Sequence, residues 1–501
     1  MYLLLKLVFL LALAYTLLNL YLFYKRSKYR HIPSPPIPLS WIWFMGHLPD
    51  LNARKSRSPN INLIQLTSEY HKEYRWDMFR LSFFHVNIVF CANLSVVQKI
   101  MTDAINFPKD RKFLDAFDVI NKACGEKLSG RYGILALEGG EIWRVKRRII
   151  DPAFKKSFLR NIMVGMNEVA LDLVKGLENK KGGTVFDITS DLGRSAMMAV
   201  SICGFDWNQK LVEEQGQNAQ DLANLMVEVI AIAIKQPFEF SLPWNDKALK
   251  LRYKNLALTV KKAMTTHLEM RMKNDNSGDI LSHIIRANEC SDQLGIDDLV
   301  DDYSIFLVAG METTAITMAT VVQFLSNHPE ECRKVQEEVD EVFEGKECLE
   351  YEDIVKFEYL ENVIKESLRM RGPVMGTWRV CKNDDITIEG VHFPKETKLV
   401  IPIDVIHHDG RYWENPSVFT PDRFSGESGK NIRPFTYMPF SAGLRNCIGK
   451  NFAMLEMKIL LSNIFRRFEF VNPHPEIKDP PRMGNITVRP LNGVPIKLYH
   501  R

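Results

Sequence analysis

The segment PFSAGLRNCIGK, residues 439–450, places one cysteine between two glycines and just ahead of a helical-looking run. Gly443 and Gly449 flank Cys447, and Pro439 precedes all three, so the segment predicts a rigid turn that ends at a helix N-terminus. Backbone N–H groups at such an end point outward and favour an anion. We therefore expect Cys447 to be ionised to a thiolate.

A thiolate in such a turn has more than one possible use. A nucleophile would need a histidine base, and His407 and His408 are available, but no motif like that of a cysteine protease surrounds them. A metal ligand would need further donors, and a porphyrin supplies four nitrogens and leaves one axial position. An inert cysteine in a turn is the third interpretation. A single-ligand heme site fits best, and the residues alone leave the inert cysteine open.

Composition limits the function classes. The chain has 501 residues, 46% of them hydrophobic, and a net charge of +4, which is too small to argue for nucleic acid as a partner. Eight cysteines are scattered without a CxxC pair, which disfavours a zinc knuckle, a redox dithiol and a disulfide scaffold. This usage is typical of the reducing cytosol.

The N-terminus belongs to a different class of sequence. Residues 7–24 carry no charge, and the run KRSKYR follows at 25–30. A spanning helix needs about 20 such residues, and a basic flank holds that end in the cytosol. We predict a single-pass anchor over 1–30, a proline-rich stiff linker over 31–46, and a cytosolic body over 47–501. A cleaved signal peptide is the alternative, but no small-residue cleavage site follows.

The body is predicted to be mainly helical with a small β region. Short β-like runs lie within 79–92, the helical period dominates from about 140 to 370, and 377–402 alternates and breaks at Gly390 and Pro394. Helix returns after Gly449. We see no convincing linker within this body.

A long helix is predicted from Asp297 to the residue before Pro329, apolar nearly all round. Its middle carries Gly310, Glu312 and Thr313 within an apolar stretch. Glycine weakens a helix by about 1 kcal/mol relative to alanine, and threonine can bond to the preceding turn, so we expect a loosened turn. An acid beside an alcohol there could hold water and pass protons, or it could be an incidental polar patch.

A second helix places Glu366 and Arg369 three residues apart on one face, and the later segment PDRF supplies Arg423. A buried glutamate between two arginines would be a structural clamp rather than a catalytic group.

These motifs together resemble the cytochromes P450, the heme-thiolate monooxygenases. The cysteine segment fits their F-x-x-G-x-R-x-C-x-G signature, AGMETT at 309–314 fits their oxygen-activating helix motif, and WRVKR at 143–147 fits their W-x-x-x-R. The glutamate–arginine motif is weak by itself, whereas the cysteine signature is highly specific. The motifs occur in the family's order and span most of the chain.

The resemblance implies a fold, a heme b cofactor and a role for each matching residue. The implied fold is a helical triangular prism with a small β region. Cys447 would be the axial ligand, Phe440 would shield its sulfur, and Glu312 with Thr313 would relay protons. The residues that would bind the heme propionates are Trp143, Arg147, Arg379 and Arg445; Gly449 completes the cysteine signature.

Longer segments, among them YRHIPSPPIP, RRIIDPAF and PFTYMPFS, resemble the cholesterol 24-hydroxylase group within this family. Ser34 stands where that group usually has glycine, and RGPVMG replaces its YPPAWG. The resemblance implies that Ala309, Val374 and Met375 border the substrate. Ser34 bears on the flexibility of the hinge, whereas Val374 and Met375 leave the sterol itself open, since methionine adapts to many shapes.

The implied activity is insertion of one oxygen atom of dioxygen into a C–H bond of a lipophilic substrate, at the endoplasmic reticulum membrane. Electrons would come from NADPH through a membrane flavoprotein reductase. Basic residues that could dock this reductase are Arg144, Lys146, Arg148, Lys450 and Lys458. A fatty-acid terminal hydroxylase is the alternative enzyme, and a non-catalytic heme-binding protein is the alternative from another class.

Overall fold

The computed structural model describes residues 2–37, 43–57, 63–110, 133–135, 137–207, 261–274, 278–290, 293–383, 385–477, 480–483 and 487–501. The chain divides into two compact units. Unit 1 comprises Met1–Asp110, Met375–Tyr412 and Pro434–Arg445, and unit 2 comprises Arg111–Val374, Trp413–Arg433 and Asn446–Arg501. The boundaries at residues 30 and 46, expected from the sequence, both fall inside unit 1 and remain predictions.

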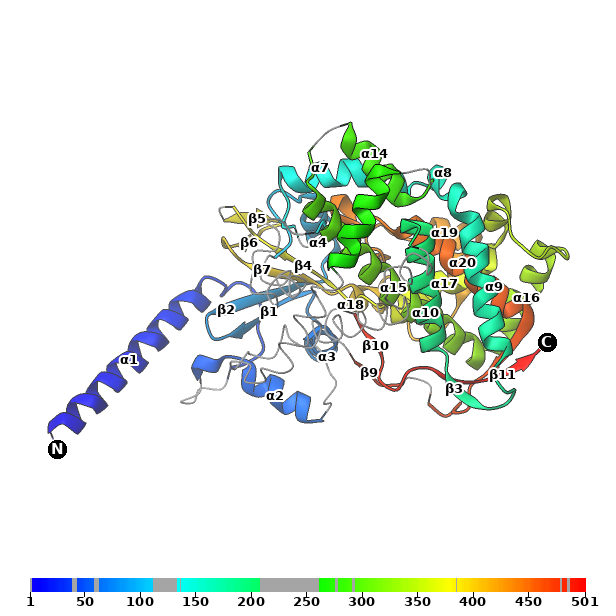
Figure 1. Ribbon diagram of the computed structural model, residues 1–501. Coiled ribbons are helices and arrows are strands. Elements are labelled where there is room, and N and C mark those ends of the chain that lie inside the picture. Colours follow the sequence, from blue (N-terminus) through cyan, green and yellow to red (C-terminus); the bar gives the residue numbers. More distant parts are fainter. Residues whose placement is uncertain are drawn as a thin grey trace. The chain divides into compact units, whose positions relative to one another are not determined.

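Unit 1 combines a long N-terminal helix with a mixed β-sheet and short helices (Figure 1). Its elements are α1 (Tyr2–Ser27), η1 (Trp43–Met45), α2 (Leu48–Arg57), α3 (Leu63–Tyr74), β1 (Met78–Phe83), β2 (Val86–Cys91), α4 (Leu94–Thr102), β4 (Thr377–Val380), β5 (Ile386–Ile388), β6 (Val391–Phe393), β7 (Lys398–Ile401), α18 (Ile403–His407) and η7 (Gly443–Arg445).

The sheet of unit 1 has the strand order β1-β2-β7-β4. Strands β1 and β2 form an antiparallel hairpin with Met78 opposite Cys91. Strand β7 then pairs parallel to β2 and antiparallel to β4. Strands β5 and β6 form a separate hairpin that turns at Gly390, so the predicted strands and the predicted break are confirmed.

Helix α1 is exposed over most of its length, and it is long and apolar enough to cross a membrane. Its last turn behaves differently. Arg26 is 5% exposed, and its Nη2 donates to the carbonyls of Phe44 at 3.0 Å and Phe84 at 3.2 Å. Arg80 of β1 donates to the Arg26 carbonyl at 2.8 Å. The end of the apolar helix is therefore bound to the β1–β2 hairpin.

The proline-rich segment also packs against the sheet of unit 1. Tyr29 Oη lies 3.0 Å from Thr397 Oγ1, and Ile32 is 3% exposed. The Arg80 amide donates to the Pro33 carbonyl at 2.8 Å. The described part of the segment therefore packs against the sheet within unit 1. Residues 38–42 lie outside the described residues.

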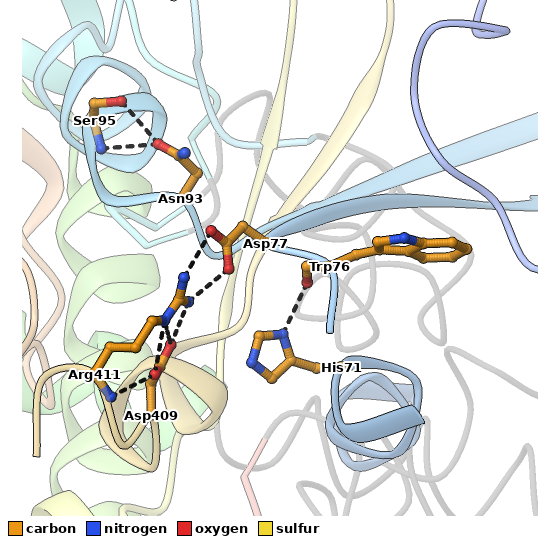
Figure 2. Close-up of polar contacts among 7 residues, drawn as sticks. All are labelled: His71, Trp76, Asp77, Asn93, Ser95, Asp409 and Arg411. Carbon is orange, nitrogen blue, oxygen red and sulfur yellow. Dashed lines mark hydrogen bonds and ion pairs between the residues drawn. The ribbon is translucent and has the colours of Figure 1, made fainter. Parts of the chain in front are cut away.

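Figure 2 shows how the loop after α18 is fixed to the start of β1. The Arg411 guanidinium donates to both oxygens of Asp77, at 2.9 and 2.6 Å, and its Nε donates to both oxygens of Asp409 at 3.0 Å. The Asn93 side chain accepts from the Ser95 amide at 3.1 Å and caps α4. Paired charges and a helix cap of this kind hold irregular chain in one conformation.

Unit 2 is mostly helical. Its elements are α7 (Glu141–Ile150), η2 (Asp151–Phe154), α8 (Lys156–Leu159), η3 (Arg160–Ile162), α9 (Met163–Glu178), β3 (Val185–Asp187), α10 (Thr189–Ala199), η4 (Val200–Gly204), α14 (Ile280–Glu289), α15 (Ile296–Asn327), α16 (Pro329–Phe343), η5 (Tyr351–Lys356), α17 (Glu358–Arg371), η6 (Pro421–Phe424), α19 (Gly426–Lys430), α20 (Lys450–Arg467), β8 (Phe468–Val471), β9 (Arg482–Met483), β10 (Arg489–Pro490) and β11 (Pro495–His500).

The core of unit 2 forms where α15 and α20 pack against α9, α10 and α17 (Figure 1). The predicted long helix is confirmed as α15, and it ends before Pro329, which begins α16. Gly310 has a packing reason that the sequence did not reveal: a Cβ there would lie 2.7 Å from Cγ2 of Val200 in the π-helical segment η4. Glycine at 310 therefore leaves room for the Val200 side chain to pack against α15.

Glu456 of α20 is fully buried, and neither carboxyl oxygen has a hydrogen-bond partner among the described residues. Burial raises the pKa of this carboxyl well above its ordinary value. The folded protein therefore retains a proton that the unfolded chain releases once the pH passes the ordinary pKa. Stability should fall as pH rises through that interval, by up to about 1.4 kcal/mol per pH unit.

Glu456→Gln removes this ionisation while keeping the size of the side chain. We expect the variant to match the wild type near pH 5 and to become progressively more stable than the wild type towards pH 8. Denaturant titration of both holoproteins at several pH values measures this, with exposed Glu469→Gln as the control. Parallel pH profiles of the wild type and Glu456→Gln would contradict the interpretation.

Candidate functional site

The cysteine segment has the geometry that its glycines predict. Cys447 is exposed and lies just before α20, for which Gly449 is the N-cap residue. A Cβ on Gly449 would lie 4.0 Å from the Cys447 sulfur. The thiol thus stands at the N-terminus of an 18-residue helix, where backbone N–H groups favour a negative charge.

The part of the segment that belongs to unit 1 is a tight turn. Gly443 has φ +69°, and a Cβ there would lie 2.0 Å from the carbonyl oxygen of Met101, so this position requires glycine. His407, which we considered as a catalytic base, is 2% exposed and accepts a hydrogen bond from the Met438 amide at 2.8 Å. His407 therefore supports the backbone just upstream of the half-buried Phe440.

Helix α7 is joined to the residue that precedes the cysteine. Arg147 donates from Nη1 to the Asn446 carbonyl at 3.0 Å and from Nη2 to the Asn446 side chain at 2.8 Å. Its Nε lies 2.6 Å from Asp151. Trp143, on the same helix, is 7% exposed. Arg147 thus holds the cysteine turn of unit 2 against α7.

Two of the predicted cationic residues lie in unit 1 and are buried. Arg445, in η7, is 7% exposed. Arg379, in β4, is 1% exposed, and its Nη1 donates to Thr377 Oγ1 and to the Trp378 carbonyl, each at 2.8 Å. Among the described residues, Nη2 of Arg379 has no partner. Burial lowers the pKa of Arg379 to about 10, and a buried guanidinium of this kind suits a carboxylate such as a heme propionate.

The acid–alcohol pair lies in the middle of α15. The Thr313 hydroxyl donates to the Ala309 carbonyl at 2.7 Å, the back-bond expected from the sequence. The helix nevertheless remains α-helical through this turn, so the expected loosening does not appear as a break. Burial raises the pKa of the Glu312 carboxyl, and a hydrogen bond from Thr487 and the charge of Arg489 act in the opposite direction.

Thr487 and Arg489 were missed in the sequence. Thr487 precedes β10 and Arg489 is the first residue of that strand, far from α15 along the chain, and no spacing rule connects such positions. The only available signal was that a carboxylate in an apolar helix needs a partner.

The structure brings the three predicted clamp residues together in unit 2. Glu366 accepts from Arg369 at 2.7 and 2.8 Å and from Arg423 at 3.2 Å, and both Glu366 and Arg369 have fully buried side chains. Glu366 also accepts from the Thr420 amide at 3.0 Å. The glutamate therefore fixes the chain at residues 420–423, at the start of η6, to α17.

The predicted substrate residues lie in three different settings. Ala309 is partly exposed on α15, and Val374 is partly exposed after α17. Met375 is 3% exposed, and its carbonyl accepts from the Asp404 amide at 2.9 Å. Their contact with a substrate remains a prediction.

Two of the five basic residues predicted to dock a reductase are buried, and for them the prediction is wrong. Lys146 is fully buried; its Nζ donates to Asp302 at 2.9 Å and to the Asp298 carbonyl at 3.1 Å. Lys458 is 5% exposed and bonds to Glu361 and to the Ile354 carbonyl. The acidic first turns of α15 thus bind a lysine of α7 in addition to any interaction with the helix dipole.

The remaining basic residues, Arg144, Arg148 and Lys450, are exposed. They stay candidates for docking, since a charge can steer a partner only where it reaches solvent.

Lys146→Met would remove one hydrogen-bond donor from the buried Asp302 carboxylate. Among the described residues, the Ile134 amide at 2.6 Å would remain as its other donor. Removing one member of a buried ion pair typically costs about 3–5 kcal/mol. We expect a loss of this size at pH 7.5, measured by denaturant titration of the holoprotein. Arg144→Met, at an exposed position of the same helix, is the control and should change stability by less than about 1 kcal/mol. Equal effects of the two substitutions would contradict the burial of Lys146.

Comparison with known proteins gives consistent results. The cytochrome P450 family model matches residues 35–495. Cytochrome P450 3A6 of Oryctolagus cuniculus is 30% identical over 352 residues, covering 67% of this chain and 70% of that protein. Cytochrome P450 4V2 of Homo sapiens is 28% identical over 459 residues, covering 86% of this chain and 84% of that protein.

Among solved structures, the heme domain of cytochrome P450DA superposes with a TM-score of 0.78 at 20% identity, covering 94% of this chain and 98% of that one. At this identity the likeness concerns the fold alone, and it agrees with the mainly helical fold expected from the sequence. None of the relatives named above is a cholesterol 24-hydroxylase, so the finer resemblance gains no support from them. The family match over most of the chain shows that this protein belongs to the cytochrome P450 family, the heme-thiolate monooxygenases.

Proposed function

We propose that this monooxygenase hydroxylates a lipophilic substrate, with a sterol as the first class to test, and that Cys447 is the axial ligand of its heme. The observation that carries the proposal is the position of Cys447 at the N-terminus of α20, in a turn that glycines make possible. A thiolate there receives support from the helix dipole. Arg379 and Arg445, both buried, would bind the heme propionates together with Trp143 and Arg147.

Heme, when bound, supplies the binding and reductive activation of dioxygen. The chain supplies the protons that this chemistry consumes. The Thr313 hydroxyl donates its own hydrogen to the Ala309 carbonyl, so its oxygen is free to accept a hydrogen bond from water or oxygen. Glu312, the residue before Thr313, can take a proton from solvent and pass it towards the Thr313 hydroxyl through water.

The clamp residues Glu366, Arg369 and Arg423 have no part in this proton path. All three face one another in unit 2, where they hold the chain between α17 and η6. Their role in the proposed function is to keep the backbone around the site in place.

The sterol assignment rests on the sequence segments that resemble the cholesterol 24-hydroxylase group, and on Val374 and Met375 as neighbours of the substrate. A fatty-acid terminal hydroxylase would use the same heme and the same proton donors. Titrating the ferric protein with sterols and with fatty acids, and following the ligand-induced spectral shift, distinguishes the two. Turnover with the same substrates, NADPH and a flavoprotein reductase then gives the hydroxylated position.

The membrane assignment rests on α1, which has the length and composition of a spanning helix. With the basic run at 25–30 in the cytosol, the body would face the cytosolic side of the endoplasmic reticulum. Arg144, Arg148 and Lys450 are the exposed charges proposed to meet an acidic reductase, and this association should weaken with salt.

Cys447→Ser should abolish the red-shifted absorption band of the reduced, carbon-monoxide-bound protein, because serine does not provide a thiolate ligand. The measurement is a difference spectrum of the full-length protein in detergent or nanodiscs. Cys348→Ser, at another exposed cysteine, is the matched control and should keep the band. A normal band in Cys447→Ser would contradict the ligand assignment.

Thr313→Ala should lower product formed per NADPH consumed by about tenfold or more, with the missing electrons recovered as hydrogen peroxide. A non-catalytic heme-binding protein would have no need of this hydroxyl. Thr317, which makes the same back-bond one turn later, to the Thr313 carbonyl at 2.8 Å, provides the control Thr317→Ala. Unchanged coupling in Thr313→Ala would count against the relay.

A further inference from the structure

One face of α1 is covered by other parts of unit 1 over the C-terminal half of the helix. Leu22 is 1% exposed and Arg26 is 5% exposed, although most of the helix is exposed. Tyr15 lies on the same face, because it precedes Leu22 by seven residues. Its ring lies edge-on to the ring of Phe44, with the two ring centroids 6.4 Å apart. Unit 1 therefore packs along α1 from Arg26 back to Tyr15, over about 16 Å of helix.

The contact between Tyr15 and Phe44 determines how deeply unit 1 reaches into a bilayer that α1 spans. The part of the helix before Tyr15 begins at Tyr2 and measures about 20 Å. The hydrocarbon core of a bilayer is about 30 Å thick, so this part alone is too short to cross it. If α1 spans the membrane, the ring of Tyr15 and the ring of Phe44 beside it must therefore lie within the membrane.

The part of unit 1 that reaches this depth is aromatic. Phe44 belongs to η1, and its ring centroid lies 6.1 Å from that of Phe84, which lies in the turn of the β1–β2 hairpin. Phe83 is the last residue of β1, and the side chains of all three residues are partly exposed. We call Phe44, Phe83 and Phe84 the aromatic tip of unit 1. Aromatic side chains are enriched where proteins meet the membrane interface.

The backbone of the aromatic tip has the partners that it needs in order to leave water. Phe83 pairs with Val86 in the hairpin. The carbonyls of Phe44 and Phe84 both accept a hydrogen bond from Nη2 of Arg26, at 3.0 and 3.2 Å. A carbonyl without a partner is strongly disfavoured beside lipid. Arg26 therefore satisfies two irregular backbone positions of the tip, while its own charge stays near the cytosolic end of α1.

We propose that the aromatic tip inserts into the cytosolic leaflet of the bilayer beside α1, as a second membrane contact of this protein. This rests on the membrane location given with the proposed function. The partner is the acyl chains and glycerol region of a phospholipid. Lys28 and Arg30, both exposed, follow at the end of α1, where they can meet lipid phosphates.

Photocrosslinking of the full-length protein in dioleoylphosphatidylcholine vesicles tests the insertion. One variant carries p-benzoylphenylalanine in place of Phe84 and a second carries it in place of Phe44, and mass spectrometry locates the new bond along the lipid. We expect crosslinks to acyl carbons at both positions, about fivefold or more above those from Ile105. Ile105 is the matched control, because it is 63% exposed and lies in unit 1, in the turn after α4. Leu11 of α1, 61% exposed, is the positive control.

Arg26→Met tests the role of the guanidinium. It removes the donor to the Phe44 and Phe84 carbonyls, so lipid crosslinking from position 84 should fall about fivefold. Lys25→Met, at the adjacent position, is the control and should leave this crosslinking unchanged. Equal crosslinking in the two variants overturns the role of Arg26 in the insertion. Only variants with a normal carbon-monoxide difference spectrum are compared, which ensures that each has folded.

The outcomes separate this inference from the proposed function. Acyl crosslinks from Leu11, with those from Phe44 and Phe84 at the level of Ile105, overturn the insertion and leave the anchor intact. Crosslinks from the aromatic tip to a second copy of the chain in place of lipid also overturn it. Absence of lipid crosslinks from Leu11 and from the tip overturns the membrane location together with the insertion. The ligation of heme by Cys447 is measured separately by the carbon-monoxide spectrum, so its failure is distinguishable from all of these results.

Discussion

Polar groups on a buried helix are stabilised by partners from neighbouring elements, and such pairs connect several helices of unit 2 to α15. Helix α15 is mostly buried, yet it carries acids, alcohols and an amide along its length. Two of these groups are bound by other helices, Asp302 by Lys146 of α7 and Gln323 by Arg371 of α17 at 2.8 Å. The hydroxyls of Thr313, Thr317 and Thr320 bond to carbonyls one turn back within α15. Unpaired, such groups would cost several kcal/mol each, and paired, they fix the helices relative to α15.

Two of the buried groups without a hydrogen-bond partner among the described residues show a contrasting case. Arg379 has an unpaired buried nitrogen, and Glu456 has two unpaired oxygens among the described residues. For Arg379 the charge is permanent, so the simplest resolution is an anionic ligand, and heme carboxylates meet that need. Glu456 can resolve the same problem without a ligand by remaining protonated. A buried polar group without a hydrogen-bond partner therefore indicates a cofactor in the case of Arg379 and a neutral acid in the case of Glu456.

The sequence predicted the local features well because their causes are local. Helix periodicity gave α15, alternation and turn residues gave β4 to β7, and the glycines around Cys447 gave the turn before α20. It also predicted the Thr313 back-bond, which joins residues four positions apart. The sequence-based predictions failed where a contact joins residues that are far apart in the sequence. The sequence predicts Lys146 as a docking residue, because a helical pattern alone does not reveal that the acidic first turns of α15 lie beside it.

Gly310 lies in the recognised motif AGMETT, yet its packing partner is also distant in the sequence and could not be predicted from it. The sequence suggested that this glycine loosens the helix, and the structure instead gives it a packing role against Val200. Thr487 could not be found at all from local pattern, since its relation to Glu312 exists only after folding.

Arg26 extends the argument to the membrane end of unit 1. The sequence predicts that its charge helps to hold this end of α1 in the cytosol. In the structure its guanidinium donates to the carbonyls of Phe44 in η1 and of Phe84 between β1 and β2. Tyr29 and the Pro33 carbonyl attach the next residues to the same sheet. A linker that begins with buried contacts cannot act as a free pivot. The C-terminal end of α1 and the β1–β2 hairpin are therefore joined directly, by the Arg26 guanidinium and by the Arg80 side chain that donates to the Arg26 carbonyl.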